Sequence, residues 1–102
     1  MINNNLRELV QTLMDSYEEA YLLCYPKVEK IINYKMKDND LIEHTLDEAL
    51  DIYTEKGFYL FLKLLIYYRT VNPKNAKNYL EILKSSREEE YGEFIKKYKK
   101  VK

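Results

Sequence analysis

Glycine and proline are scarce in this chain, with two of each among 102 residues, and tryptophan is absent. This leaves little material for hairpin turns or for glycine-rich phosphate-binding loops. The single cysteine excludes an internal disulfide and a multi-cysteine zinc site. Charge of one sign is not in excess either, because 17 basic residues balance 17 acidic ones. That balance excludes a uniformly basic nucleic-acid-binding domain.

Long apolar runs are also missing. The longest, Phe58 to Tyr68, has eleven residues and is interrupted by Lys63, whereas a membrane-spanning helix needs about 20. No charged-then-apolar leader opens the sequence. We therefore expect a cytoplasmic protein without membrane contact, folded as one domain over residues 1–102, since about a hundred residues suffice for one core.

What the chain does contain is apolar residues at helical spacing, which predict an all-α bundle of about five helices. Asparagines at positions 3–5 can cap the first helix. Pro26 should end or kink this helix, because proline lacks a backbone donor. A short second helix follows, with Met36 among its inward residues. The inward stripe of the first helix comprises Leu6, Leu9, Val10, Leu13, Tyr17, Ala20, Tyr21 and Cys24.

The third predicted helix begins at Asp40, with Asp40 as N-cap and Glu43 three residues later in a carboxylate version of the capping box. On a helical wheel its apolar residues fill one half. The other half is expected to be a fully solvated acidic face. That face consists of Asp40, Glu43, His44, Asp47, Glu48 and Asp51.

Gly57 is predicted to stop the third helix with a positive φ angle. The apolar run 58–68 then forms the buried central helix of the bundle. Asn72 followed by Pro73 marks the start of the last helix, with a capping asparagine before a proline at the first helical position. One helical phase continues from Pro73 to the end and favours a single long basic helix. Ser86 with Glu89 leaves open a restart as two helices.

Two constellations suggest chemistry. His44 among carboxylates has the spacing of a divalent metal site, but an ordinary solvated face explains the same residues. Cys24 and His44 could pair as nucleophile and base, yet they fall on opposite sides of their helices, inward and outward. We expect neither a cofactor nor a metal, and no enzymatic activity.

The compositional outlier is tyrosine, with 11 residues. Tyrosine is enriched in protein interfaces because it combines a large rigid surface with a polar tip. The leading hypothesis is therefore a non-enzymatic module that binds another protein, with self-association as a further possibility. The expected contacts are the acidic face and an aromatic, lysine-rich C-terminal face: Asp40, Glu43, Asp47, Asp51, Tyr91, Phe94, Lys97 and Tyr98.

A nucleic-acid-binding regulator is the alternative. Residues 58–84 can be interpreted as a helix-turn-helix whose second helix offers lysine to phosphates and asparagine to bases. Charge by segment keeps this alternative open: residues 38–55 carry seven acidic and no basic groups, and residues 56–84 carry six basic and one acidic. The candidate contacts are Arg69, Lys74, Asn75, Lys77 and Asn78.

The segment from Lys63 to Tyr68, followed by Asn72-Pro73, Ala76 and Tyr79, resembles a pattern in small uncharacterised all-helical proteins of clostridial mobile elements. The resemblance covers residues 47–84. It implies a helical fold and a phage, plasmid or conjugative-element setting, without an activity. In that setting an inhibitor, immunity or regulatory factor is the expected role.

Overall fold

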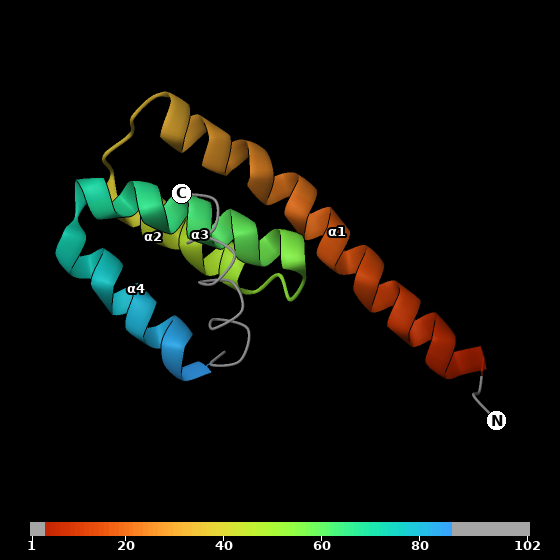
Figure 1. Ribbon diagram of the computed structural model, residues 1–102. Coiled ribbons are helices and arrows are strands. Elements are labelled where there is room, and N and C mark those ends of the chain that lie inside the picture. Colours follow the sequence, from red (N-terminus) through yellow and green to blue (C-terminus); the bar gives the residue numbers. More distant parts are fainter. Residues whose placement is uncertain (1–3, 87–102) are drawn as a thin grey trace, which may run out of the picture.

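The computed structural model describes residues 4–86, which form four α-helices and no strand (Figure 1). The helices are α1 (Asn4–Asn33), α2 (Asn39–Leu50), α3 (Glu55–Val71) and α4 (Pro73–Ser86). The all-α prediction is confirmed, and the number five is wrong for this part of the chain. Predictions for residues 87–102, including the long basic C-terminal helix and Tyr91, Phe94, Lys97 and Tyr98, lie outside the described residues.

The first two predicted helices are one helix, because Pro26 lies inside α1 without ending it. A proline at this position removes the hydrogen bond that its N–H would give to the carbonyl of Leu22. Pro26 and Leu22 are both exposed, so water can bond that carbonyl. The result is a helix of 30 residues, about 45 Å long.

α1 ends in a Schellman motif rather than continuing to Met36. The Met36 N–H donates to the Ile31 carbonyl at 2.9 Å and the Lys35 N–H to the Ile32 carbonyl at 3.2 Å. Lys35 takes the left-handed conformation with φ 51°, which this cap requires and which glycine would adopt more readily. The half-buried Met36 packs against the core, so the cap turns the chain toward α2.

Caps explain the remaining boundaries, two of which differ from the prediction. Asp38, not Asp40, is the N-cap of α2 and accepts from the Leu41 N–H at 3.2 Å. Thr54 caps α3 by accepting from the Gly57 N–H at 3.1 Å. The prediction that Gly57 stops the preceding helix with a positive φ angle is wrong, because Gly57 lies in the first turn of α3 and its φ angle is not positive. A Cβ atom there would come within 2.5 Å of the Ile52 carbonyl oxygen. The Asn72–Pro73 start of α4 is confirmed, since Asn72 accepts from the Asn75 N–H at 3.1 Å.

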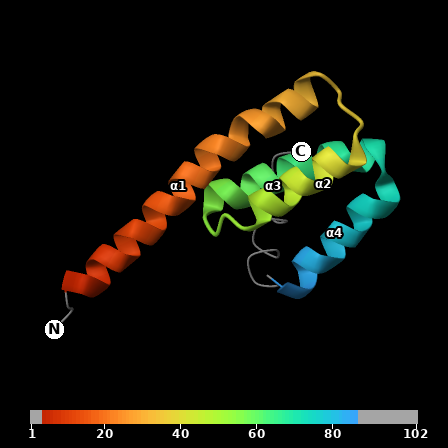
Figure 2. The ribbon, with the colours of Figure 1, turned by 180° about the vertical axis from the view of Figure 1, so that it is seen from behind.

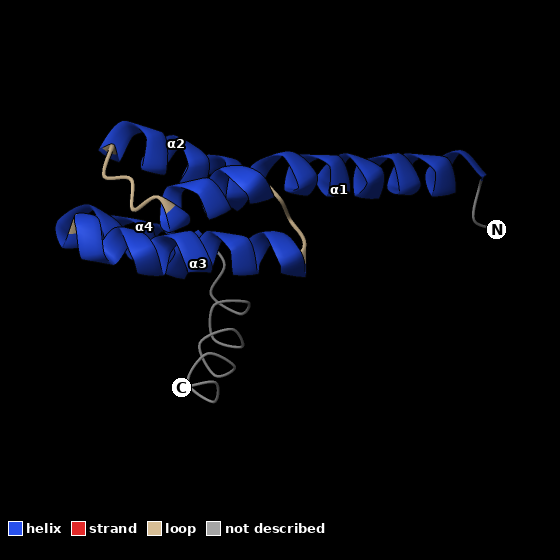
Figure 3. Ribbon diagram, turned by 90° about the horizontal axis from the view of Figure 1, so that it is seen from above, coloured by secondary structure: helices blue, strands red, loops and turns tan. Residues whose placement is uncertain are grey.

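α3 is the central helix, as predicted, and packs against α1, α2 and α4. Figure 2 shows α2 and α3 side by side, with α4 along one side of this pair and the second half of α1 along the other. The view from above places α3 beneath α2 and leaves the first half of α1 extending beyond the bundle (Figure 3). The buried residues of α3 are Gly57, Phe58, Leu60, Phe61, Leu62, Leu64, Leu65 and Tyr68.

Candidate interaction surface

The predicted inward stripe of α1 has two different environments. Its C-terminal part enters the core, where Cys24, Val28 and Ile31 are at most 1% exposed. Tyr17, Ala20 and Tyr21 pack partly against the core. The prediction that the whole stripe is inward is wrong, because its first four residues are 50–66% exposed, namely Leu6, Leu9, Val10 and Leu13.

The exposed first half of α1, residues 4–16, is called the overhang here, and its apolar face is the overhang stripe. Leu9 and Met14 bound this face, which covers an arc of about 140° at 100° per residue. No charged residue falls within the arc. Arg7 and Glu18 lie just beyond its Met14 edge, and the other acidic residues lie on the opposite side of the helix. The overhang stripe consists of Leu6, Leu9, Val10, Leu13 and Met14, each between 49 and 66% exposed.

The connection between α2 and α3 and the first turn of α3 contact α1 directly after the overhang. The rings of Tyr17 and Tyr53 have centroids 6.1 Å apart. Lys56 lies 3.7 Å from a Glu18 carboxylate oxygen and 5.6 Å from the centre of the Tyr21 ring. The stripe therefore passes without interruption from the overhang, past this contact, into the hydrophobic core.

The acidic side of α2 is not the fully solvated face that its pattern predicts. Glu43 is half-buried and accepts hydrogen bonds from the Tyr68 hydroxyl and, at 2.8 Å, from the Asn75 side-chain amide. Asp47 accepts from the Tyr79 hydroxyl at 3.0 Å. Burial, and then the hydrogen bonds to these carboxylates, raise the pKa of both tyrosines. Two of the four acidic residues proposed for partner binding thus join α2 to α3 and α4.

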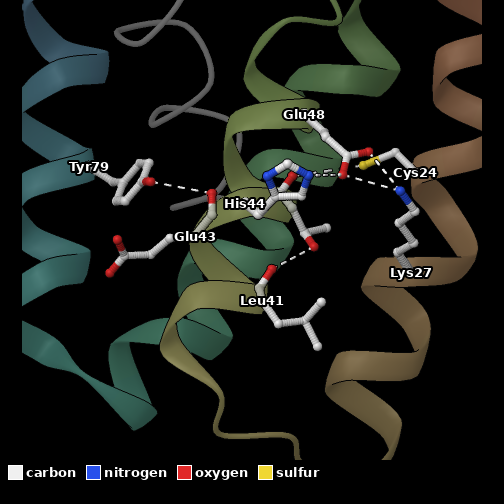
Figure 4. A network of polar contacts seen from close by, with 8 residues as sticks. Cys24, Lys27, Leu41, Glu43, His44, Glu48 and Tyr79 are labelled. Carbon is white, nitrogen blue, oxygen red and sulfur yellow. Dashed lines mark hydrogen bonds and ion pairs between the residues drawn. The ribbon is translucent and has the colours of Figure 1, made fainter.

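The other residues of this face have separate surroundings. Asp40 and Asp51 are exposed, as partner binding requires. Glu48 pairs with Lys27 of α1 at 3.0 Å and with His44 at 3.3 Å (Figure 4). The spacing of four residues brings His44 beside Glu48, as the metal-site hypothesis required. Among the residues described, however, no cluster of three groups is able to hold a metal ion.

Cys24 of α1 lies in the core beside α2 and donates to the Thr45 carbonyl, with 3.9 Å between sulfur and oxygen. Burial is the main reason that the pKa of this thiol rises to about 11. Near neutral pH the sulfur is therefore protonated, which makes it a poor nucleophile. Its placement on the inward stripe is confirmed, and its chemistry there is that of a small apolar residue.

The five candidate nucleic-acid contacts differ in how accessible their side chains are. Arg69, Lys74, Lys77 and Asn78 are exposed. Asn75 is half-buried, and its side-chain amide is engaged by Glu43. A base contact through Asn75 would have to break that hydrogen bond, so the structure leaves the two lysines, Arg69 and Asn78 as the accessible groups of this face.

Sequence reasoning found the apolar stripe but missed that half of it lies outside the bundle. The helix lengths would have been the signal: α3, with 17 residues, can cover only about 26 Å of a 45 Å helix. Comparisons with protein families, curated proteins and solved structures found no match to this chain. Among residues 4–86, none of the helices combines the length and apolar character required to cross a membrane.

Proposed function

We propose that this protein is a non-enzymatic module that binds another protein through the overhang stripe. The observation that carries the proposal is the set of five large apolar side chains, each about half exposed, on one charge-free face of a protruding helix. Scattered exposed leucines are ordinary on a protein surface, whereas a contiguous apolar patch marks an interaction site.

The size of the patch supports this interpretation. At roughly 100 Å² per half-exposed side chain, the overhang stripe offers about 500 Å², within the range of the largest and often functional patches on monomers. A protruding amphipathic helix is also a common recognition element, because its residues at spacings of three and four enter the apolar groove or seam of a partner. We expect the partner surface to be apolar and helical.

The carboxylates of α2 have a supporting role in this proposal. Glu43, Asp47 and Glu48 are bonded to neighbouring helices, so they stabilise the bundle that holds the overhang in place. Of the predicted acidic contacts, Asp40, Asp47 and Asp51 are exposed, and Asp47 already accepts a hydrogen bond from Tyr79, so Asp40 and Asp51 are the better candidates for additional contacts. The resemblance of residues 47–84 to mobile-element proteins extends the proposal to a cytoplasmic inhibitor, immunity or regulatory factor.

Photo-crosslinking in cells of the native host tests the proposal. A photoreactive phenylalanine analogue replaces Leu9 in one variant and Leu22 in the other, since both leucines are exposed on α1 but on different faces. We expect protein adducts from position 9 that Leu13→Glu abolishes, and few from position 22. Equal adducts from both positions, or none from position 9, would refute binding through the overhang stripe.

The exposed basic residues at the end of α3 and on α4 favour a second candidate function, nucleic-acid binding. Lys74 and Lys77 can neutralise phosphates, so binding should weaken steeply as salt rises. Fluorescence polarisation with duplex DNA and with RNA, across a salt series, measures this slope. Lys74→Glu with Lys77→Glu should remove binding, and Lys30→Glu on α1 is the control. No binding at low salt would eliminate this candidate.

A further inference from the structure

We infer that the partner of the overhang stripe is a second copy of this chain, paired antiparallel through the two overhangs. This inference rests on the proposed function, because it names the occupant of the same surface. It is motivated by three properties of the described residues: the spacing of the stripe, the position of the charges beside it, and its continuity with the core of the bundle.

The spacing is that of helices that pair in register. Leu6, Val10, Leu13 and Tyr17 follow one another at steps of four, three and four residues, which is the seam of a two-helix coiled coil. An antiparallel two-fold arrangement makes four layers from these residues. Val10 then packs against Leu13 of the second copy in the two central layers. In the two outer layers Leu6 packs against the exposed part of Tyr17 of the second copy, a side chain that its own Tyr53 partly covers. Each layer joins two apolar side chains.

The charges beside the seam complement their own symmetry mates. Arg7 and Glu18 lie on the same flank of α1, just beyond Met14. In the antiparallel register given by these layers, Arg7 comes beside Glu18 of the second copy, and the two-fold axis repeats the contact. The remaining acidic residues of this half lie on the far sides of both helices. Glu18 also pairs with Lys56 of its own chain at 3.7 Å, so its carboxylate would lie between that lysine and Arg7 of the second copy.

The antiparallel direction also follows from where the bundle lies. The stripe faces the same side of α1 as α2 and α3, and the connection at Tyr53 contacts Tyr17. An antiparallel overhang occupies the free length of α1 up to this contact, in line with the bundle. A parallel overhang would bring the two bundles against each other. The overhang stripe continues into the core, and the free apolar surface that it offers therefore ends where the N-terminus of the second copy's α1 would lie.

The buried area sets the expected affinity. About 500 Å² from each copy gives roughly 1,000 Å², just below the ~1,200 Å² at which specific interfaces begin. We therefore expect a reversible dimer with a dissociation constant on the order of 10 µM. A protein of this kind is a monomer at low concentration and a dimer where its local concentration is high.

Sedimentation velocity of the full chain, from about 1 to about 300 µM, measures this equilibrium. The unmodified chain should move from monomer to dimer across the range. Leu13→Glu places a charge in the two central layers and should weaken association by about 100-fold or more. Leu22→Glu, an equally exposed leucine outside the seam, should leave association unchanged. Circular dichroism and thermal unfolding check that both variants keep the bundle, because neither side chain is buried.

Charge reversal tests the register. Arg7→Glu alone and Glu18→Arg alone should each weaken the dimer by about 3- to 10-fold. The double variant should restore most of the affinity, with the remaining loss due to the Lys56 ion pair that Glu18→Arg removes. A dimer that Leu13→Glu does not weaken would contradict the seam. Additive losses in the double variant would contradict the antiparallel register.

The failure of this inference can be told from failure of the proposed function. A purified chain that stays monomeric at all concentrations, while position 9 still gives adducts with a different protein in cells, overturns self-pairing but keeps the interaction module. A monomer whose overhang amides exchange slowly with solvent would mean that the chain's own residues 87–102 cover the stripe, which also overturns self-pairing. Absence of both dimer and adducts would refute both proposals.

Discussion

The two halves of α1 share one apolar stripe and have opposite surroundings. Residues 24–33 place Cys24, Val28 and Ile31 in the core at 1% exposure or less, whereas residues 4–16 place leucines of the same helical phase at half exposure or more. The difference shows that amphipathic periodicity marks which face of a helix is apolar. The surface that covers this face depends on the lengths of the neighbouring helices.

The difference has an energetic consequence, because only the second half of α1 contributes to the folding free energy of the single chain. Apolar burial supplies the main favourable term in folding, at about 25 cal/mol for each Å² removed from water. The overhang stripe stays in water in the monomer and contributes little. It gains its burial energy only on association, which separates the residues that fold the protein from those that bind.

The largest expected effect comes from shortening matched apolar side chains in the two halves. Ile31→Ala should reduce the free energy of unfolding by about 2–5 kcal/mol, because it removes core contacts and leaves a cavity. Leu9→Ala should change it by less than about 0.5 kcal/mol, since the side chain is exposed. Urea denaturation at low micromolar concentration measures both. Similar losses from the two variants would contradict the division of α1.

A smaller effect is expected where the α2–α3 connection meets α1. In Gly57→Ala the new methyl group would meet the Ile52 side chain and carbonyl oxygen at about 2.5 Å. The connection would have to shift, at a cost of about 1–3 kcal/mol. The tyrosine contact at the start of the overhang should loosen at the same time. Thermal unfolding together with tyrosine fluorescence follows both changes.

The acidic residues of α2 can be separated in the same way. Glu43→Ala leaves the Tyr68 hydroxyl and the Asn75 amide without their acceptor, which should cost about 1–2 kcal/mol. Asp40→Ala, on the same helix but exposed, should cost less than about 0.5 kcal/mol. Chemical denaturation compares the two variants. Equal, small losses would mean that Glu43 is as solvated as the sequence pattern suggests.

The smallest effect is a pH dependence in the packed half of α1. Lys63 donates to Glu29 at 2.5 Å, and this hydrogen bond lowers the pKa of Glu29 and raises the pKa of Lys63. A lowered carboxyl pKa gives stability that is present above its unfolded value and is lost as the pH falls through the folded value. A raised lysine pKa gives stability that is present below its unfolded value and is lost as the pH rises through the folded value.

The pair should therefore stabilise the fold between about pH 5 and pH 10, by less than about 1 kcal/mol because it is solvent-exposed. Urea denaturation of the unmodified chain and of Lys63→Met, at acid, neutral and alkaline pH, measures the contribution. The difference between the two proteins should be largest near neutral pH and should shrink toward both extremes. A difference that does not change with pH would show that the ion pair contributes nothing.

Much of the fold was predictable because local signals determine it. The central helix follows from an apolar run without a polar face, and the start of α4 follows from an asparagine–proline pair. The errors occur where two local signals compete. Asp38 and Asp40 can both cap α2, and Pro26 can break a helix or, on an exposed face, remain inside one. Gly57 was expected to provide a positive φ angle. The structure requires glycine there for a different reason, since Ile52 lies against the backbone and leaves no room for a Cβ atom.

The candidate site was less predictable than the fold. Glu43 belongs to the acidic half of its helical wheel, but the positions of Tyr68 and Asn75 on two other helices decide that it is half-buried. The overhang stripe has the same pattern as a core stripe, and only the relative lengths of α1 and α3 distinguish the two. Such tertiary information is not contained in a local pattern.

Hydrogen exchange of the backbone amides in α1, followed from low to high micromolar protein concentration, tests the central claim most directly. The account predicts that amides of residues 24–33 are protected at every concentration, since this half belongs to the core. Amides of residues 6–17 should exchange rapidly in the dilute chain and at least about tenfold more slowly as the protein associates. Rapid exchange of residues 6–17 at all concentrations, in a chain whose residues 24–33 stay protected, would contradict it.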